Sequence, residues 1–268
     1  MDLAFLDIDG TLVFPERDFI GAGIAYRCVD RTVDRQVGFA SVRLIELLCE
    51  LETHGIQVVP TTARSAVQLN RMQLFANANT IAIVGAGATV IIDGAIDASW
   101  HQLRSELTQS SAPLSDVARE IELTLDGSAR IDLREGALLV LTYSTPDLGE
   151  RQLEAILDVL GSLGWHACLD GRRLYLLPNG LSKLAAAEFV AESRGVGWWA
   201  AAGDSSLDVG LLERASYGVT PAGSWVACDP DRASGIHVTA LGRPHAAEQV
   251  CETILRARDA AVTGWKGI

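Results

Sequence analysis

The chain has 268 residues, of which 49% are hydrophobic and 21% charged, a balance typical of a soluble globular protein with one large or two medium domains. Its formal net charge of -12 argues against nucleic acid and an anionic membrane as partners, because both would repel it. The five cysteines form no C-x-x-C pair, so we expect reduced thiols. With no secretory leader and no apolar run as long as a membrane span, the sequence predicts a cytoplasmic protein.

The first predicted element is a buried strand that ends on two aspartates. Leu3–Leu6 is apolar, and Asp7, Asp9 and Gly10 follow it. Because side chains alternate along a strand, Asp7 and Asp9 project to the same side, at the edge where parallel sheets bind ligands. Two carboxylates this close repel each other unless a cation lies between them or one keeps a proton. The pattern favours a Mg²⁺ site or a carboxylate nucleophile beside an acid-base partner, although aspartates at strand ends also cap turns.

The next segment, residues 13–39, is mixed and polar. It predicts either a small hairpin flap over the site or a plain surface excursion. Apolar residues at helical spacing then predict a helix over 40–54, and the apolar run 56–60 predicts a second parallel strand.

That second strand leads to Thr62 and Arg64, before a segment with helical spacing over 67–74. A hydroxyl at the end of a strand and the start of a helix has two possible roles. It caps the helix, or together with free amides it holds a phosphate group. Arg64 is a candidate phosphate ligand, or only a residue at the helix start.

A third strand is predicted over 81–84, and it runs into Gly85-Ala86-Gly87. This glycine pattern suggests a dinucleotide-binding loop, but Val90 stands where the third glycine belongs and the following residues are strand-like. We therefore reject a dinucleotide site.

The chain changes character from about residue 93 to 178. Residues 99–112 are polar and predict a linker. Amphipathic helices and strands follow in the order αββαββ, with helices over 114–125 and 148–163 and strands over 130–133, 138–143, 165–169 and 173–177. This order indicates a compact α+β unit inserted between the two halves of an α/β core.

The returning chain carries two further groups of candidate residues. Ser182 can cap a helix. Lys183 in the first turn would be destabilised by the helix dipole, which is unusual for a lysine that has no function. An apolar strand, 196–202, then precedes Asp204 and Asp208, two carboxylates that can converge on one cation. Strands over 218–220 and 235–240 and a helix over 246–262 complete the predicted core.

Four of these motifs together resemble the signatures of the haloacid dehalogenase (HAD) superfamily. They are Asp7-Ile8-Asp9-Gly10-Thr11-Leu12, Thr62-Ala63-Arg64, Lys183, and Gly203-Asp204-Ser205-Ser206-Leu207-Asp208. The inserted unit resembles the small C2-type cap of sucrose-phosphate, trehalose-phosphate and mannosyl-phosphoglycerate phosphatases and of phosphomannomutase. The resemblance implies a Rossmann-like parallel-sheet core over 1–92 and 179–268 with a C2-type cap over 93–178. The chain departs from the family pattern at Ala63, which replaces a glycine, and at Ala86 and Leu207, which each replace an asparagine.

The resemblance also implies a mechanism. Asp7 attacks phosphorus and forms an aspartyl phosphate, while Asp9 protonates the leaving oxygen and later activates water. Mg²⁺ lies on Asp7, the backbone carbonyl of Asp9, and Asp204, with Asp208 as a direct or indirect partner. Thr62, Lys183 and Arg64 form the expected substrate-binding set for the transferring phosphoryl group.

We therefore expect a Mg²⁺-dependent phosphomonoesterase acting on a small phosphorylated metabolite, such as a sugar or polyol phosphate. A phosphomutase on the same scaffold is the alternative enzyme, and a catalytically weak ligand-binding protein is the alternative of another class. The clustered charges argue against the latter, because an idle site has no reason to keep them. Selectivity should come from the inserted unit, where the candidate side chains are Arg130, Arg134, Arg172 and Arg173.

Overall fold

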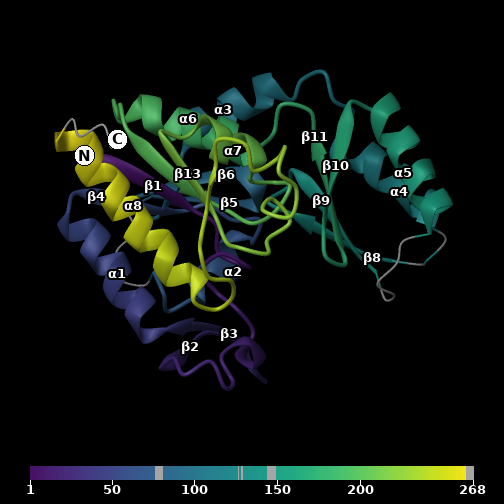
Figure 1. Cartoon of the computed structure of the whole chain (residues 1–268). Helices are drawn as coiled ribbons and strands as arrows, with labels where there is room; N and C mark the ends of the chain where they lie inside the picture. The colour runs from purple at the N-terminus through teal and green to yellow at the C-terminus, as the bar shows by residue number, and fades with distance from the viewer. Residues whose placement is uncertain (76–80, 126, 128, 144–148, 264–268) are drawn as a thin grey trace.

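The computed structural model describes residues 1–75, 81–125, 127, 129–143 and 149–263. A five-stranded parallel sheet forms its centre (Figure 1). In spatial order the strands are β14 (His237–Val238), β13 (Tyr217–Thr220), β12 (Trp199–Ala202), β1 (Asp2–Leu6) and β4 (Ile56–Pro60). Because β1 lies between β12 and β4, the aspartates that follow it emerge in the interior of the sheet's carboxyl edge.

Helices cover both faces of this sheet. Ala4 and Leu6 of β1 belong to the core on one face, whereas Leu3 and Phe5 belong to the core on the other, as the alternation of strand side chains requires. The first face is covered by α1 (Val42–Thr53) and α8 (Ala246–Thr263), and the second by α6 (Lys183–Ser193) and α7 (Val209–Arg214). The predicted α/β class is confirmed. None of the helices among the described residues is long and apolar enough to cross a membrane.

A small antiparallel sheet adjoins the end of β4. It consists of β5 (Ile81–Val84), β6 (Thr89–Ile92) and β7 (Ala95–Ile96), with the short 3-10 turn η2 (Gly85–Gly87) between its first two strands. Thr61 forms a parallel bridge with Ile83 and so joins this sheet to β4. The strand predicted after the glycines is confirmed as β6. This strand was the reason for rejecting a dinucleotide site, which would need a helix there.

The segment between β1 and α1 forms a hairpin, after the short 3-10 turn η1 (Glu16–Asp18). β2 (Tyr26–Arg31) pairs antiparallel with β3 (Gln36–Ser41), which resolves the choice between a hairpin and a surface excursion. Val29 and Phe39 are buried in the core beneath α1, so the hairpin is packed against the body of the protein.

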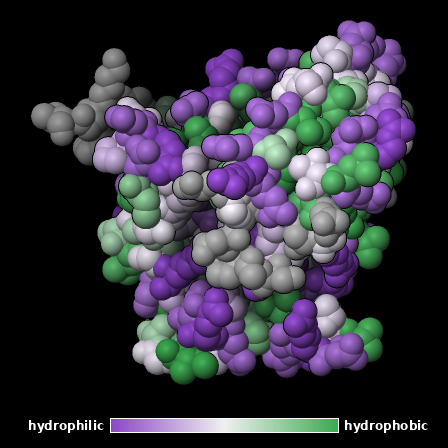
Figure 2. Space-filling model, turned by 90° about the vertical axis from the view of Figure 1, so that its right-hand side faces the viewer, coloured by the Kyte–Doolittle hydropathy of each residue, from purple (hydrophilic) through white to green (hydrophobic). Residues whose placement is uncertain are grey.

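The α+β unit, residues 114–178, lies at one end of the molecule (Figure 1). Its antiparallel sheet has the order β10-β11-β9-β8, and its helices share a separate core that contains Val117, Ile121, Ile156 and Leu160. The elements are α4 (Leu114–Leu125), β8 (Ala129–Arg134), β9 (Leu138–Tyr143), α5 (Glu150–Ser162), β10 (Trp165–Asp170) and β11 (Arg173–Pro178), which confirms the order αββαββ. Figure 2 views the molecule from this end and shows hydrophilic residues with hydrophobic groups between them.

The predicted linker over 99–112 is wrong for most of its length, because α3 (Ala98–Leu107) occupies it. The helix begins at Asp97, whose side chain accepts a hydrogen bond from the amide of Trp100. Trp100 is 1% exposed, and its indole nitrogen donates to the carbonyl of Gly87 at 3.0 Å. This aromatic anchor, with Leu103 partly buried against the same core, fixes a largely polar helix on the second face of the sheet.

Replacing Trp100 with alanine should lower the free energy of unfolding by about 3–5 kcal/mol, because it empties a buried site and leaves a carbonyl unpaired. Gln102→Ala in the same helix is the control, since Gln102 is exposed and its loss should change stability by less than about 0.5 kcal/mol. Urea unfolding measures both. Equal effects of the two substitutions would contradict the anchoring role of Trp100.

Candidate active site

Three aspartates meet at the carboxyl edge of the parallel sheet. Asp7 follows β1, and Asp204 and Asp208 lie between β12 and α7. All three are buried, and one oxygen of each lies within 4.8 Å of the others. Among the described residues, this is the one group of acidic, histidine or cysteine side chains close enough to share a metal ion. They converge because the strands that carry them are parallel.

The ammonium group of Lys183 lies inside this acidic cluster. Ser182 caps α6 by accepting a hydrogen bond from the amide of Ala185, which makes Lys183 the first helical residue. Its Nζ donates to Oδ1 of Asp7 and to Oδ1 of Asp208, each at 2.6 Å. Burial alone would lower the pKa of Lys183, but the carboxylates of Asp208 and Asp7 raise it above its usual range. Lys183 therefore stays charged in the interior.

Asp208 organises the loop that carries Asp204. Its Oδ1 accepts from Lys183, and its Oδ2 accepts from the amides of Asp204 and Ser205 and from the Ser205 hydroxyl, at 3.2, 3.0 and 2.8 Å. A Cβ at Gly203 would lie 2.3 Å from the Cβ of Asp208, so only glycine fits there. Both oxygens of Asp208 are thus engaged within the protein.

One lysine cannot neutralise three buried carboxylates. Burial raises the pKa of Asp7 to about 7, with Lys183 acting against the shift and Asp208 adding to it. Burial together with Asp7 and Asp208 also raises the pKa of Asp204 well above its usual range, although Arg243 lies 3.2 Å away. Hard oxygen ligands with surplus negative charge are the donor set that Mg²⁺ prefers, so these residues fit that ion.

The side chain of Asp9 does not join the acidic cluster. It is 49% exposed and accepts from Nε and Nη2 of Arg64 at 2.7 and 2.6 Å. The next residue, Gly10, has φ of 83°, and a Cβ there would lie 2.0 Å from Oδ2 of Asp204. Glycine is therefore required where the chain passes the acidic cluster. Metal ligation by the backbone carbonyl of Asp9 stays a prediction.

Thr62 and Arg64 lie in the loop after β4. Thr62 is buried, and its hydroxyl accepts from the amide of Arg64 at 3.1 Å. The helix that follows, α2 (Ala66–Asn70), is shorter than predicted and is capped by Ser65, whose hydroxyl accepts from the amide of Gln68. The capping role weighed for Thr62 thus belongs to Ser65. A phosphate-holding role for Thr62 remains a prediction.

Sequence reasoning missed two charged residues at the site. Arg243 contacts Asp204, and Asp30 of β2 accepts from Nη1 of Arg64 at 2.5 Å. Asp30 lies on a hairpin outside the parallel sheet, and Arg243 lies in the loop between β14 and α8. Neither residue belongs to a recognisable motif, so their positions at the site depend on the tertiary structure. Asp30 also lies in the segment whose structure the sequence left open.

The ends of two strands of the α+β unit, β8 and β10, contact the loops that carry the site. Nη1 of Arg134 donates to the carbonyl of Ala63 at 2.9 Å, and the hydroxyl of Ser206 donates to the carbonyl of Leu169 at 3.4 Å. Arg134 is thus the selectivity candidate that reaches the loop of Thr62. Arg130 instead pairs with an aspartate of its own strand.

All three departures from the resembling motifs lie in one apolar cluster that joins the site loops to the α+β unit, and Ala63 is one of its partly buried members. Ala86 is buried and Leu207 is partly buried there. Their neighbours in the cluster include Leu138, Val140, Tyr175, Leu177 and Leu181. Apolar side chains at both positions therefore suit this packing, where an asparagine amide would lose water.

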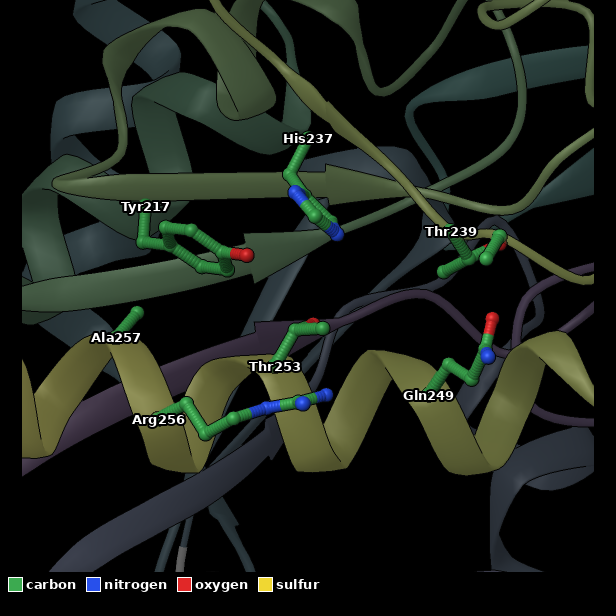
Figure 3. Close-up of a pocket in the computed structure, with 8 residues that line it drawn as sticks. Tyr217, His237, Thr239, Gln249, Thr253, Arg256 and Ala257 are labelled. Atoms are coloured by element: carbon green, nitrogen blue, oxygen red, sulfur yellow. The ribbon is translucent and has the colours of Figure 1, made fainter.

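A separate hollow of about 470 Å³ lies between α8 and the strands β13 and β14 (Figure 3). Its lining includes Tyr217, His237, Thr253 and Arg256, and none of the predicted site residues. None of the described residues that line it is a carboxylate, so their side chains offer none of the chemistry of the acidic cluster.

Mg²⁺ should raise the Tm of the protein, because a cation relieves the repulsion between Asp7 and Asp204. At a Mg²⁺ concentration a hundred times its Kd, the free energy of unfolding should rise by about 2.7 kcal/mol. Asp204→Asn should abolish this rise without lowering the Tm of the metal-free protein, since the substitution removes both a ligand and a repelling charge. Asp158→Asn, on the exposed face of α5, is the control and should keep the full rise. An undiminished rise in Asp204→Asn would contradict the metal site.

No protein-family model matches the sequence, and no curated protein matches it. Solved structures do match over nearly the whole chain. The sucrose-phosphatase of Synechocystis sp. PCC6803, in complex with sucrose and phosphate, is 16% identical over 96% of this chain and 98% of its own, with a TM-score of 0.65. The HAD subclass IIB sugar phosphatase BT4131 is 14% identical over 98% and 99%, with a TM-score of 0.64.

The phosphatase BT1666 from Bacteroides thetaiotaomicron is 16% identical over 96% of this chain and 95% of its own, with a TM-score of 0.60. At identities this low, the structural similarity establishes the fold alone, and that fold is shared along nearly the full length of each protein. The structural neighbours of this chain are phosphatases of the HAD superfamily, and the chain has their fold.

Proposed function

We propose that this protein is a Mg²⁺-dependent phosphomonoesterase that removes phosphate from a small metabolite through an aspartyl phosphate. One observation carries the proposal. Lys183 lies between Asp7 and Asp208, beside Asp204, in a buried cluster at the carboxyl edge of the sheet. A nucleophilic carboxylate, a fixed ammonium group and oxygen ligands for a cation are the parts that phosphoryl transfer requires.

In the first step an oxygen of Asp7 forms a bond to phosphorus as the bond from phosphorus to the leaving oxygen breaks. Lys183 holds Oδ1 of Asp7, which fixes the carboxylate plane and favours its ionised form. Mg²⁺ held by Asp7, Asp204 and the backbone carbonyl of Asp9 would neutralise charge on the transferring group. Thr62 and Lys183 would hold the phosphoryl oxygens. Asp208, with both oxygens engaged, serves chiefly to fix Lys183 and the loop.

Asp9 completes the reaction as the acid-base residue. It gives a proton to the leaving oxygen in the first step and takes one from the water that attacks the aspartyl phosphate in the second. Its partly exposed carboxylate, two residues beyond Asp7, suits an exchange of protons with substrate and solvent.

The α+β unit would act as the cap that covers the site and excludes water during transfer. We assign residues 1–92 and 179–268 to the catalytic core and 93–178 to the cap. Because Trp100 packs in the core, the part of the cap free to move would begin after α3. Arg134, at the end of β8, already reaches the loop of Thr62, which suits a selectivity role.

The substrate class that we favour is a sugar or polyol phosphate. The support comes from neighbours of the same fold that are a sucrose-phosphatase and a sugar phosphatase. The net charge of -12 agrees with a small substrate that is drawn in by a local cation rather than by the protein's overall field.

Phosphate release from a panel of sugar, polyol and aryl phosphates tests the proposal. Wild-type protein should release phosphate with Mg²⁺ and not with chelator. Asp7→Asn should lower kcat by about a thousandfold or more, because it removes the nucleophile and little volume. Asp158→Asn serves as the control for the substitution itself. Folded Asp7→Asn that keeps wild-type turnover would refute the nucleophile assignment.

A further inference from the structure

A chain of ion pairs runs from the site into the β2–β3 hairpin. Asp9 pairs with one edge of the Arg64 guanidinium, and Nη1 of the same group donates to Oδ2 of Asp30 at 2.5 Å. Nε of Arg71 donates to Oδ1 of Asp30 at 2.6 Å. Four alternating charges thus form a neutral row, and its third member, Asp30, has a side chain that is 0% exposed.

The backbone fixes Asp30 at this point. The pairing of β2 with β3 is irregular between Cys28 and Asp30, the kind of bulge that re-aims a side chain. The backbone of Asp30 also forms an isolated antiparallel β-bridge with Met72, which follows Arg71 in the segment after α2. On β3 a Cβ at Gly38 would lie 3.1 Å from the Cβ of Asp30, so glycine leaves room for the aspartate.

Asp30 determines how Arg64 is oriented. Burial alone would raise the pKa of Asp30, but hydrogen bonds from Arg71 and Arg64 outweigh burial and hold its pKa below the usual value. A charged Asp30 therefore binds one nitrogen of a rigid, planar guanidinium. The opposite edge of that group is then presented to both oxygens of Asp9, which sets the plane of the Asp9 carboxylate.

We propose that Asp30 is a positioning residue that orients the acid-base residue Asp9 through Arg64. The inference rests on the proposed function, since it assigns a purpose to the orientation of Asp9. Asp30 bonds to the two arginines and lies outside the acidic cluster.

The test compares leaving groups. An alkyl phosphate needs a proton on its leaving oxygen, whereas 4-nitrophenolate leaves without one, so loss of acid catalysis slows the alkyl substrate more. Asp9→Asn should lower the ratio of kcat/KM for an alkyl phosphate to that for 4-nitrophenyl phosphate by about a hundredfold. Asp30→Asn should lower the same ratio by about tenfold. In the double variant with Asp9→Asn it should lower the ratio no further than Asp9→Asn does alone.

Asp2→Asn is the matched control, because it breaks a partly buried pair with Arg258 at the opposite end of β1. General damage lowers both rates together and leaves the ratio unchanged. If thermal unfolding shows that Asp30→Asn does not fold, Asp30→Glu takes its place. This variant keeps the buried charge but displaces the carboxylate, so it should also lower the ratio. An unchanged or increased ratio in the folded Asp30 variant overturns the inference. Wild-type protein that hydrolyses neither ester instead overturns the proposed function.

Discussion

The buried ammonium of Lys183 between Asp7 and Asp208 is the interaction on which the rest of the site depends. Removing carboxylates from water is unfavourable, and one lysine leaves the acidic cluster with surplus negative charge. The raised pKa of Asp7 reflects that surplus. The local backbone is adapted to the same packing, because neither Gly10 nor Gly203 has space for a side chain. Because the carboxylates repel one another when no cation is bound, the site is suited to bind one.

A second ionic system lies beside the first and has the opposite character. The row from Asp9 through Arg64 to Asp30 and Arg71 is balanced in charge, so it needs no added ion. Its geometry is set by a hairpin and a short loop rather than by the central sheet. The two systems meet at the DxD segment, where Asp7 belongs to the acidic cluster and Asp9 to the row. This division matches the separate tasks proposed for the two carboxylates.

The sequence predicted those features that follow from local chemistry. In the parallel core, Asp7 directly follows β1, Lys183 begins α6 and Asp208 directly precedes α7. Parallel topology alone brings residues at such positions to one edge of the sheet. The αββαββ order was readable because its helices are amphipathic. Asp30 could not be predicted, because its partner Arg64 is 34 residues away and only the tertiary fold joins them. Helix α3 was missed because its few apolar residues, Trp100, Leu103 and Leu107, stand among polar ones, and Trp100 is the one that is fully buried.

The most direct measurement is the location of the phosphoryl group during turnover. Wild-type protein and the Asp9→Asn variant would be acid-quenched during steady-state turnover of 4-nitrophenyl phosphate, and their peptides analysed by mass spectrometry. Because this leaving group needs no proton, the variant chiefly slows the attack by water. The proposed mechanism predicts one phosphoryl group on Asp7, more abundant in the variant and lost when chelator is added before the substrate. Metal-dependent hydrolysis with the phosphoryl group on another residue, or on no residue in either protein, would contradict it.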